Sequence, residues 1–114
     1  MINNLYTKNN LQISKVTTNN YSTSFSLGVK MLSQKNQGPI YAIYGFVRYA
    51  DEIVDTFFDY PQKELLEEFI AETYRAIDRK ISTNPIIDSF QNVVNEYDIE
   101  KSHIDAFLNS MRMD

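Results

Sequence analysis

The sequence predicts an all-α fold, and three features of the 114-residue chain lead to this prediction. Apolar residues recur at helical spacing almost throughout, which is typical of amphipathic helices. The chain has only three Gly and three Pro, so few residues interrupt that spacing. At 43% hydrophobic residues it has enough apolar side chains for a core, and it contains no repeat or linker that would divide it into domains.

The first half of the chain is expected to form two long helical regions. The first is predicted over residues 11–32, with an interruption near residues 18–20, where polar and β-branched residues cluster. The segment SQKNQGP, residues 33–39, is predicted as a loop. Its Pro39 would occupy the first turn of the next helix, which is expected to reach Phe58.

The second half carries signals for three further helix starts. Asp59 and Gln62, three residues apart, resemble a capping box before a helix that runs to Ile81. The run Thr83-Asn84-Pro85 predicts a cap with proline in the first turn of a helix over residues 86–97. The last helix is expected to begin within residues 98–100 and to place four apolar residues on one face: Ile104, Phe107, Leu108 and Met111.

Composition excludes several classes of function. The net charge of −4 is small and the basic residues are scattered, so we expect no nucleic acid partner. The absence of Cys excludes disulfides, thiolate zinc sites and cysteine nucleophiles. No signal peptide is recognisable, and no segment approaches the roughly 20 apolar residues of a membrane span. We therefore expect a cytoplasmic protein.

The segment YGFVRYADEIVD, residues 44–55, holds the most unusual pattern. At about 100° per residue, Tyr44, Arg48, Asp51 and Asp55 fall within a stripe of roughly 60° on one helix face. Apolar residues cover most of the remaining circumference, and a helix that is apolar nearly all round is usually buried. The stripe is therefore expected to face an internal cavity.

Two carboxylates at positions i and i+4 repel each other, and burial makes each more costly unless a cation neutralises it. Oxygen ligands of this kind suit Mg²⁺, which is commonly held by one or two carboxylates together with substrate phosphates. Arg48 adds a planar donor group suited to phosphate oxygens. The alternative is that the two acids are solvated surface residues and that Arg48 is a structural partner of Asp51 or Glu52.

These residues resemble a known family. YAIYGFVRYADEIVD is similar to the first aspartate-rich region of the squalene and phytoene synthases, the head-to-head branch of the trans-isoprenyl diphosphate synthases. Upstream, YSTSFSLGVKML resembles the serine-rich element of that family, and the closing DAFLNSMRMD resembles the start of its next helix. The resemblance extends over residues 20–114 and implies the N-terminal portion of an isoprenoid-synthase-type helical bundle.

The resemblance implies a transferase that condenses two C15 or C20 prenyl diphosphates head to head, with Mg²⁺ as cofactor, in carotenoid or related isoprenoid biosynthesis. Asp51 and Asp55 would be the metal ligands. Arg48, Ser22 and Ser24 would contact diphosphate, and Tyr44 would line the cavity near the reacting centre. The second aspartate-rich motif of the family lies beyond residue 114, so residues 1–114 are expected to form only the first part of the synthase domain and to be inactive alone.

Simpler roles remain open for the remaining candidates. Ser22 and Ser24 could cap a helix, and Tyr44 could be an ordinary core residue. Glu52 points away from the stripe, so a supporting or arginine-pairing role is expected rather than metal ligation. His103 is expected on the surface, and three other acids are expected to be solvated or to cap helices: Asp88, Asp98 and Asp105.

Two other kinds of protein remain open as alternatives. One is a non-catalytic assembly or scaffold relative of the same fold, and the other is a chain-elongating prenyl transferase or terpene cyclase. We further expect the isolated chain to self-associate through exposed apolar surface. Peripheral membrane contact for product release is also expected.

Overall fold

The computed structural model describes residues 4–21 and 34–113, and in that part of the chain every regular element is an α-helix. The helices are α1 (Asn4–Tyr21), α3 (Gln34–Thr56), α4 (Gln62–Arg79), α5 (Pro85–Glu96) and α6 (Lys101–Met113). The predicted all-α fold is confirmed.

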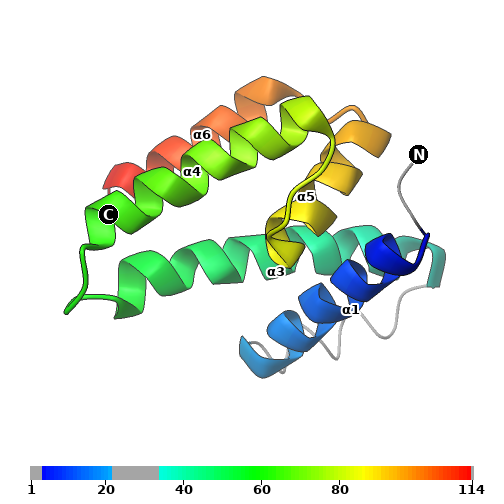
Figure 1. Ribbon diagram of the computed structural model, residues 1–114, viewed down its shortest axis with the longest axis horizontal. Coiled ribbons are helices and arrows are strands. Elements are labelled where there is room, and N and C mark those ends of the chain that lie inside the picture. The colour runs from blue at the N-terminus through cyan, green and yellow to red at the C-terminus, as the bar shows by residue number, and fades with distance from the viewer. Residues whose placement is uncertain (1–3, 22–33, 114) are drawn as a thin grey trace.

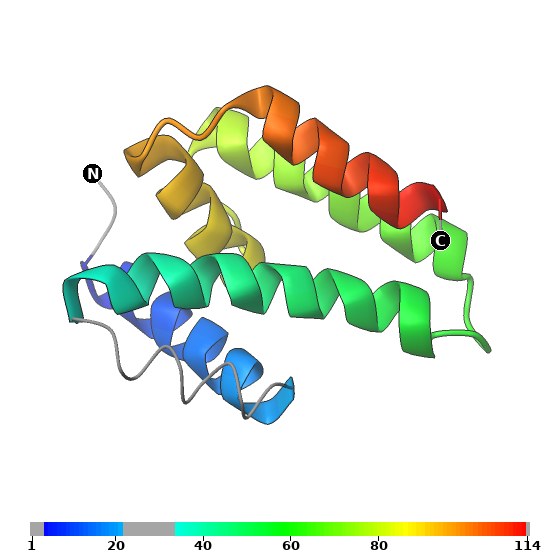
Figure 2. The same cartoon turned by 180° about the vertical axis from the view of Figure 1, so that it is seen from behind.

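The long helix α3 organises the arrangement (Figure 1). Helices α4 and α6 lie side by side along one side of α3, while α1 packs on its other side. Helix α5 lies between α3 and the α4–α6 pair and also contacts α1, as the reverse view in Figure 2 confirms. The central position of α3 fixes the placement of the residues predicted to carry function.

The core is centred on Phe46 of α3, which is fully buried. Its ring stacks on Phe90 of α5 at a centroid distance of 3.8 Å and on Phe69 of α4 at 5.2 Å. The ring of Phe107 in α6 lies 6.0 Å away. One side chain thus joins four helices, and truncating such a buried aromatic typically costs about 3–5 kcal/mol.

The predicted start of α5 is confirmed in detail. Asn84 is the N-cap, its side-chain oxygen accepts hydrogen bonds from the amides of Ile86 and Ile87, and Pro85 occupies the first turn. Helix α6 begins at Lys101, one residue beyond the expected range. Ile104, Leu108 and Met111 of its predicted apolar face are buried and Phe107 is partly buried.

The predicted capping box at Asp59 and Gln62 is wrong. The N-cap of α4 is Pro61, with no side-chain hydrogen bond. The Gln62 side-chain amide instead donates to the carbonyl oxygens of Ile53 and Val54, at 2.8 and 2.7 Å. These carbonyls lie in the last turn of α3, where no helical donor follows, so Gln62 satisfies the end of one helix rather than the start of the next.

The predicted loop over residues 33–39 is also wrong for its described part, because α3 already begins at Gln34 and contains Pro39. Gln and Lys are good helix formers, which favours this start. Pro39 lies in the second turn, so it costs α3 one i→i−4 hydrogen bond near its N-terminus. At the other end α3 stops at Thr56, two residues before the predicted Phe58.

Helix α1 begins at Asn4 rather than at Leu11 and runs through residues 18–20 without the predicted interruption. The continuation of this region to Leu32 lies outside the described residues. Its buried side chains are polar, namely Asn10, Ser14 and Thr18, each at most 1% exposed. The prediction placed the start of this helix too late because it relied on regularly spaced apolar residues, and the buried face of α1 is polar instead.

Polar contacts hold α1 in place. The Asn10 side-chain amide donates to the Asp88 carboxylate at 2.9 Å, and the Tyr6 hydroxyl donates to the carbonyl oxygen of Ser82. Ser14 packs directly on Gly45 of α3, where an added Cβ would lie 3.1 Å from the Ser14 carbonyl oxygen. Close approach of small residues therefore replaces apolar burial at this contact.

The expectation that Asp88 is solvated or caps a helix is wrong, since its side chain is fully buried. Its carboxylate accepts hydrogen bonds from Asn10, from the amide of Ser82 and from the side chain of Gln91. Such donors make burial of a carboxylate tolerable. By contrast, Asp98 and His103 are exposed.

Candidate functional site

The four residues of the predicted stripe lie on one unbroken helix. Helix α3 extends from Gln34 to Thr56, so the helical period places Tyr44, Arg48, Asp51 and Asp55 on one face. The opposite face is buried through Ala42, Phe46, Ala50 and Ile53. The core therefore fixes the rotation of α3, and with it the direction in which the stripe points.

The stripe lies on the less covered side of the described structure. The side chains of Arg48 and Asp51 are 30% and 23% exposed, Tyr44 is partly buried and Asp55 is exposed. The expectation that this helix is buried nearly all round is wrong for the described residues, because Ile43 and Tyr49 are also exposed.

Arg48 and Asp51 form an ion pair, with Arg48 Nη1 3.1 Å from Asp51 Oδ2. This is the structural partnership that the sequence left open as an alternative. A partly exposed pair of this kind contributes about 1 kcal/mol, so a ligand can compete for either group.

The donor set of the stripe is compatible with Mg²⁺. Asp51 and Asp55 offer oxygen ligands one helical turn apart, and Mg²⁺ is usually held by one or two carboxylates completed by waters and phosphate oxygens. Within residues 4–21 and 34–113, no group of three or more Asp, Glu or His side chains could hold a metal ion. The carboxylate pair would therefore bind Mg²⁺ weakly without a phosphate ligand.

The remaining predicted site residues are placed only in part. Ser22 and Ser24 lie outside the described residues. Tyr44 lies one turn before Arg48 on the stripe. Glu52 is partly buried and lies about 100° around the helix from Asp51, consistent with its exclusion from the predicted metal ligands.

Glu72 of α4 and Asp105 of α6 are carboxylates whose pKa lies below the ordinary range. A hydrogen bond from the Ser82 hydroxyl, followed by one from Arg75, lowers the pKa of Glu72. The Tyr74 hydroxyl and then Lys101 lower the pKa of Asp105, while burial and this carboxylate raise the pKa of Tyr74 to about 12. These contacts join α4 to its neighbours and lie away from the stripe.

Sequence reasoning missed Glu96 and Tyr97, which lie at the end of α5 and line a cavity between α1, α3 and α5. Neither residue belongs to a recognisable motif, and only the packing of three helices brings them beside the cavity.

None of the described helices is both long and apolar enough to cross a membrane.

Comparison with known proteins adds one finding to this geometry. The family model described as "Squalene/phytoene synthase" matches residues 18–114, which include the stripe and all helices from α3 onward. Searches among curated proteins and among solved structures found no match. The match covers most of the chain, and the chain therefore belongs to the squalene/phytoene synthase family.

Proposed function

We propose that the chain supplies the first aspartate-rich site of a head-to-head prenyltransferase, which joins two C15 or C20 prenyl diphosphates. The family consists of such transferases and typically depends on Mg²⁺. The observation that carries the proposal is the common face of α3 on which Arg48, Asp51 and Asp55 lie outside the packed core.

In this proposal each stripe residue has a separate role. Asp51 and Asp55 hold Mg²⁺, which when bound neutralises charge that develops on the departing diphosphate. Arg48 donates to diphosphate oxygens, so the ion pair with Asp51 opens or is shared when substrate binds. Tyr44 lines the space beside the reacting carbon, and Ser22 and Ser24 supply further donors to diphosphate.

The exposure of Asp55 and the partial exposure of Arg48 and Asp51 support the idea that a further segment completes the site. Allylic cations react with water, so such chemistry needs an enclosed apolar cavity. Residues 1–114 would then form the first part of one isoprenoid synthase domain, with a second aspartate-rich helix supplied elsewhere. The isolated chain should not release diphosphate from a prenyl diphosphate, and measurable turnover by the purified chain would contradict this part of the proposal.

The proposal is tested in a protein that combines this chain with a second aspartate-rich helix. Asp51→Asn and Asp55→Asn should each lower Mg²⁺-dependent diphosphate release by about 100-fold or more, because each removes a charge that holds the metal. Glu52→Gln is the matched control, since it changes a neighbouring acid off the stripe and should cost much less. Rates within a few-fold of the unsubstituted protein would make both aspartates structural.

A non-catalytic scaffold role is the second candidate, and one observation favours it. Among the described residues, no group of three or more acidic or His side chains could hold a metal ion. A scaffold would bind neither Mg²⁺ nor diphosphate at the stripe, which separates it from both the head-to-head synthase and a chain-elongating transferase or terpene cyclase. The head-to-head synthase differs in its product from a chain-elongating transferase or a terpene cyclase, since only the head-to-head enzyme forms a 1,1′-linked chain.

The proposal extends to location and partners. Prenyl diphosphates are the expected substrates, and the products are long hydrocarbons that dissolve in lipid. We therefore propose a cytoplasmic protein with peripheral contact at a membrane for product release.

A further inference from the structure

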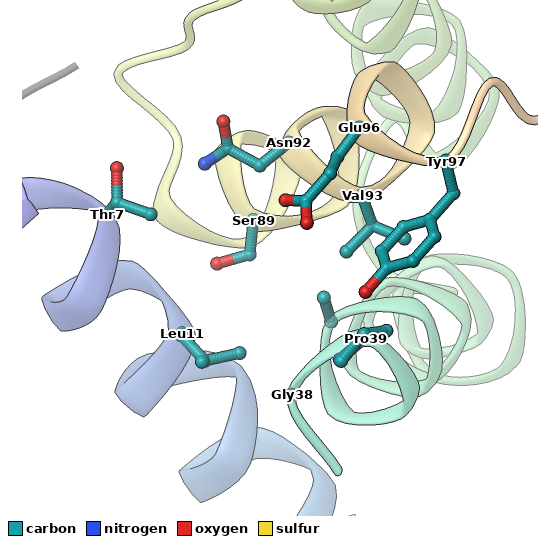
Figure 3. A pocket seen from close by; sticks show the side chains of 10 residues that line it. Thr7, Leu11, Gly38, Pro39, Ser89, Asn92, Val93, Glu96 and Tyr97 are labelled. Carbon is teal, nitrogen blue, oxygen red and sulfur yellow. The ribbon is translucent and has the colours of Figure 1, made fainter. Parts of the chain in front are cut away.

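A cavity of about 280 Å³ lies between α1, α3 and α5 (Figure 3). Ala42 of α3 lines it, and this residue lies about 160° around the helix from Tyr44. The cavity is therefore on the opposite side of α3 from the charged stripe and does not belong to the proposed diphosphate site.

Most of the cavity wall is apolar. Leu11 extends into it from α1, Pro39 and Ala42 line it from α3, and Val93 lines it from α5. Ligand sites typically combine an apolar wall of this kind with a few polar groups that orient the ligand. The volume suits a molecule with a single ring or a short branched chain.

One end of the cavity is negatively charged. Among the described residues that line it, Glu96 is the only charged one, and in Figure 3 its side chain extends from α5 toward the cavity. Glu96 is also the last residue of α5, and no basic residue lies in the last turn of that helix. The carboxylate and the negative pole of the helix therefore act together to favour a cation.

Two more polar groups line the same space. Ser89 is only 4% exposed, and its hydroxyl has no hydrogen-bond partner among the described residues. A buried hydroxyl without a partner is uncommon and indicates a missing ligand atom or water. Tyr97, the C-cap of α5, presents its ring and hydroxyl beside Pro39 (Figure 3).

We propose that this cavity binds a small organic ammonium ion with an apolar body. Glu96 pairs with the ammonium group, and the face of the Tyr97 ring offers a further cation contact. The apolar body lies on Leu11, Ala42 and Val93, while the Ser89 hydroxyl receives a hydrogen bond from the ligand. A neutral or anionic ligand of the same shape lacks the charge that this end of α5 selects.

Three small probes with the same ring test the proposal on the purified chain: benzylamine, benzyl alcohol and benzoate. Amide chemical shifts in ¹H–¹⁵N spectra are followed during each titration. Benzylamine should give saturable shifts at residues that line the cavity, with binding at least several-fold tighter than benzyl alcohol and no comparable binding of benzoate.

Substitutions locate the charge dependence. Glu96→Gln should weaken benzylamine about threefold to tenfold and leave benzyl alcohol unchanged, because it removes an exposed charge without disturbing the core. Glu100→Gln is the matched control, since it removes an equal charge from an exposed position that does not line the cavity. Ser89→Ala should weaken benzylamine by a few-fold without changing the urea midpoint, because its hydroxyl has no described partner to lose.

Equal binding of benzylamine and benzyl alcohol would overturn the proposed cation selectivity. Equal weakening by Glu96→Gln and Glu100→Gln would show a general charge effect and overturn the assignment to Glu96. No saturable shift at the lining residues up to about 10 mM benzylamine would exclude a site even of millimolar affinity.

Discussion

Replacement of Asp88 by alanine should strongly destabilise the chain. The buried carboxylate accepts hydrogen bonds from Asn10 at 2.9 Å, the Ser82 amide at 2.9 Å and Gln91 at 3.1 Å. Alanine removes the acceptor of the Asn10 side chain and of the Ser82 amide, at about 1–3 kcal/mol each, while Gln91 keeps its hydrogen bond to Asn92. Allowing for relaxation and water entry, we expect a loss of about 3–5 kcal/mol, a large share of the 5–15 kcal/mol typical of a domain.

The assay is urea unfolding followed by circular dichroism at 222 nm. With a slope of about 1–3 kcal/mol per molar urea, Asp88→Ala should lower the midpoint by at least about 1 M. Asp78→Ala is the matched control, because Asp78 is exposed on α4 and its replacement should change stability by less than about 0.5 kcal/mol. Equal midpoints for the two variants would refute the structural role of Asp88.

An exchange of partners separates hydrogen bonding from packing. In the double variant Asn10→Asp, Asp88→Asn, the new amide at position 88 can donate to the new carboxylate at position 10 and still accept from Ser82 and Gln91. The double variant should therefore be more stable than the sum of its single variants predicts. Strict additivity would show that Asn10 and Asp88 do not interact.

Three further predictions concern other parts of the chain. Gly45→Ala should lower stability by about 1 kcal/mol, because the added Cβ would lie 3.1 Å from the Ser14 carbonyl oxygen. The gain in helix propensity offsets only part of that strain. An unchanged urea midpoint would contradict the close contact. Glu72→Gln should lower stability at pH 7. The lowered pKa of Glu72 contributes stability that is present above the ordinary pKa of 4.5 and is lost as pH falls through the folded value. The difference in stability between Glu72→Gln and the unsubstituted chain should therefore disappear in acid. The exposed control Glu68→Gln should show little difference at either pH. The isolated chain should associate as its concentration rises, because large apolar side chains such as Phe58 are exposed; sedimentation equilibrium that fits a monomer at all concentrations would contradict this.

Local patterns predicted the helices best where the stabilising interactions are themselves local. Asn84 caps the helix that follows it, and the apolar period of α6 matches its buried face. The polar N-terminal part of α1 gave no such signal, since its stabilisation comes from Asp88, 78 residues later in the chain. Gln62 illustrates the same limit, because its position suggested a cap for α4 while its side chain bonds to the end of α3.

The candidate site was predictable to the extent that it depends on helix geometry. The helical period alone placed Tyr44, Arg48, Asp51 and Asp55 on one face of α3. The period could not predict the exposure of that face, because exposure depends on which helices pack around α3. The cavity beside Glu96 was equally beyond local patterns, since it requires three separate helices.

Mg²⁺-dependent binding of pyrophosphate to the purified chain tests the central claim most directly. Isothermal titration should show weak binding of Mg²⁺ alone and tighter binding of pyrophosphate when Mg²⁺ is present, because phosphate oxygens complete the metal's ligands. Asp51→Asn and Asp55→Asn should each abolish this Mg²⁺-dependent gain. The metal-free free energy of unfolding should fall by at most about 1 kcal/mol for Asp51→Asn, which weakens the ion pair with Arg48, and should stay unchanged for Asp55→Asn. Glu52→Gln should retain the gain. Pyrophosphate binding that is independent of Mg²⁺, or that survives both aspartate substitutions, would contradict the assignment of the stripe as a metal-diphosphate site.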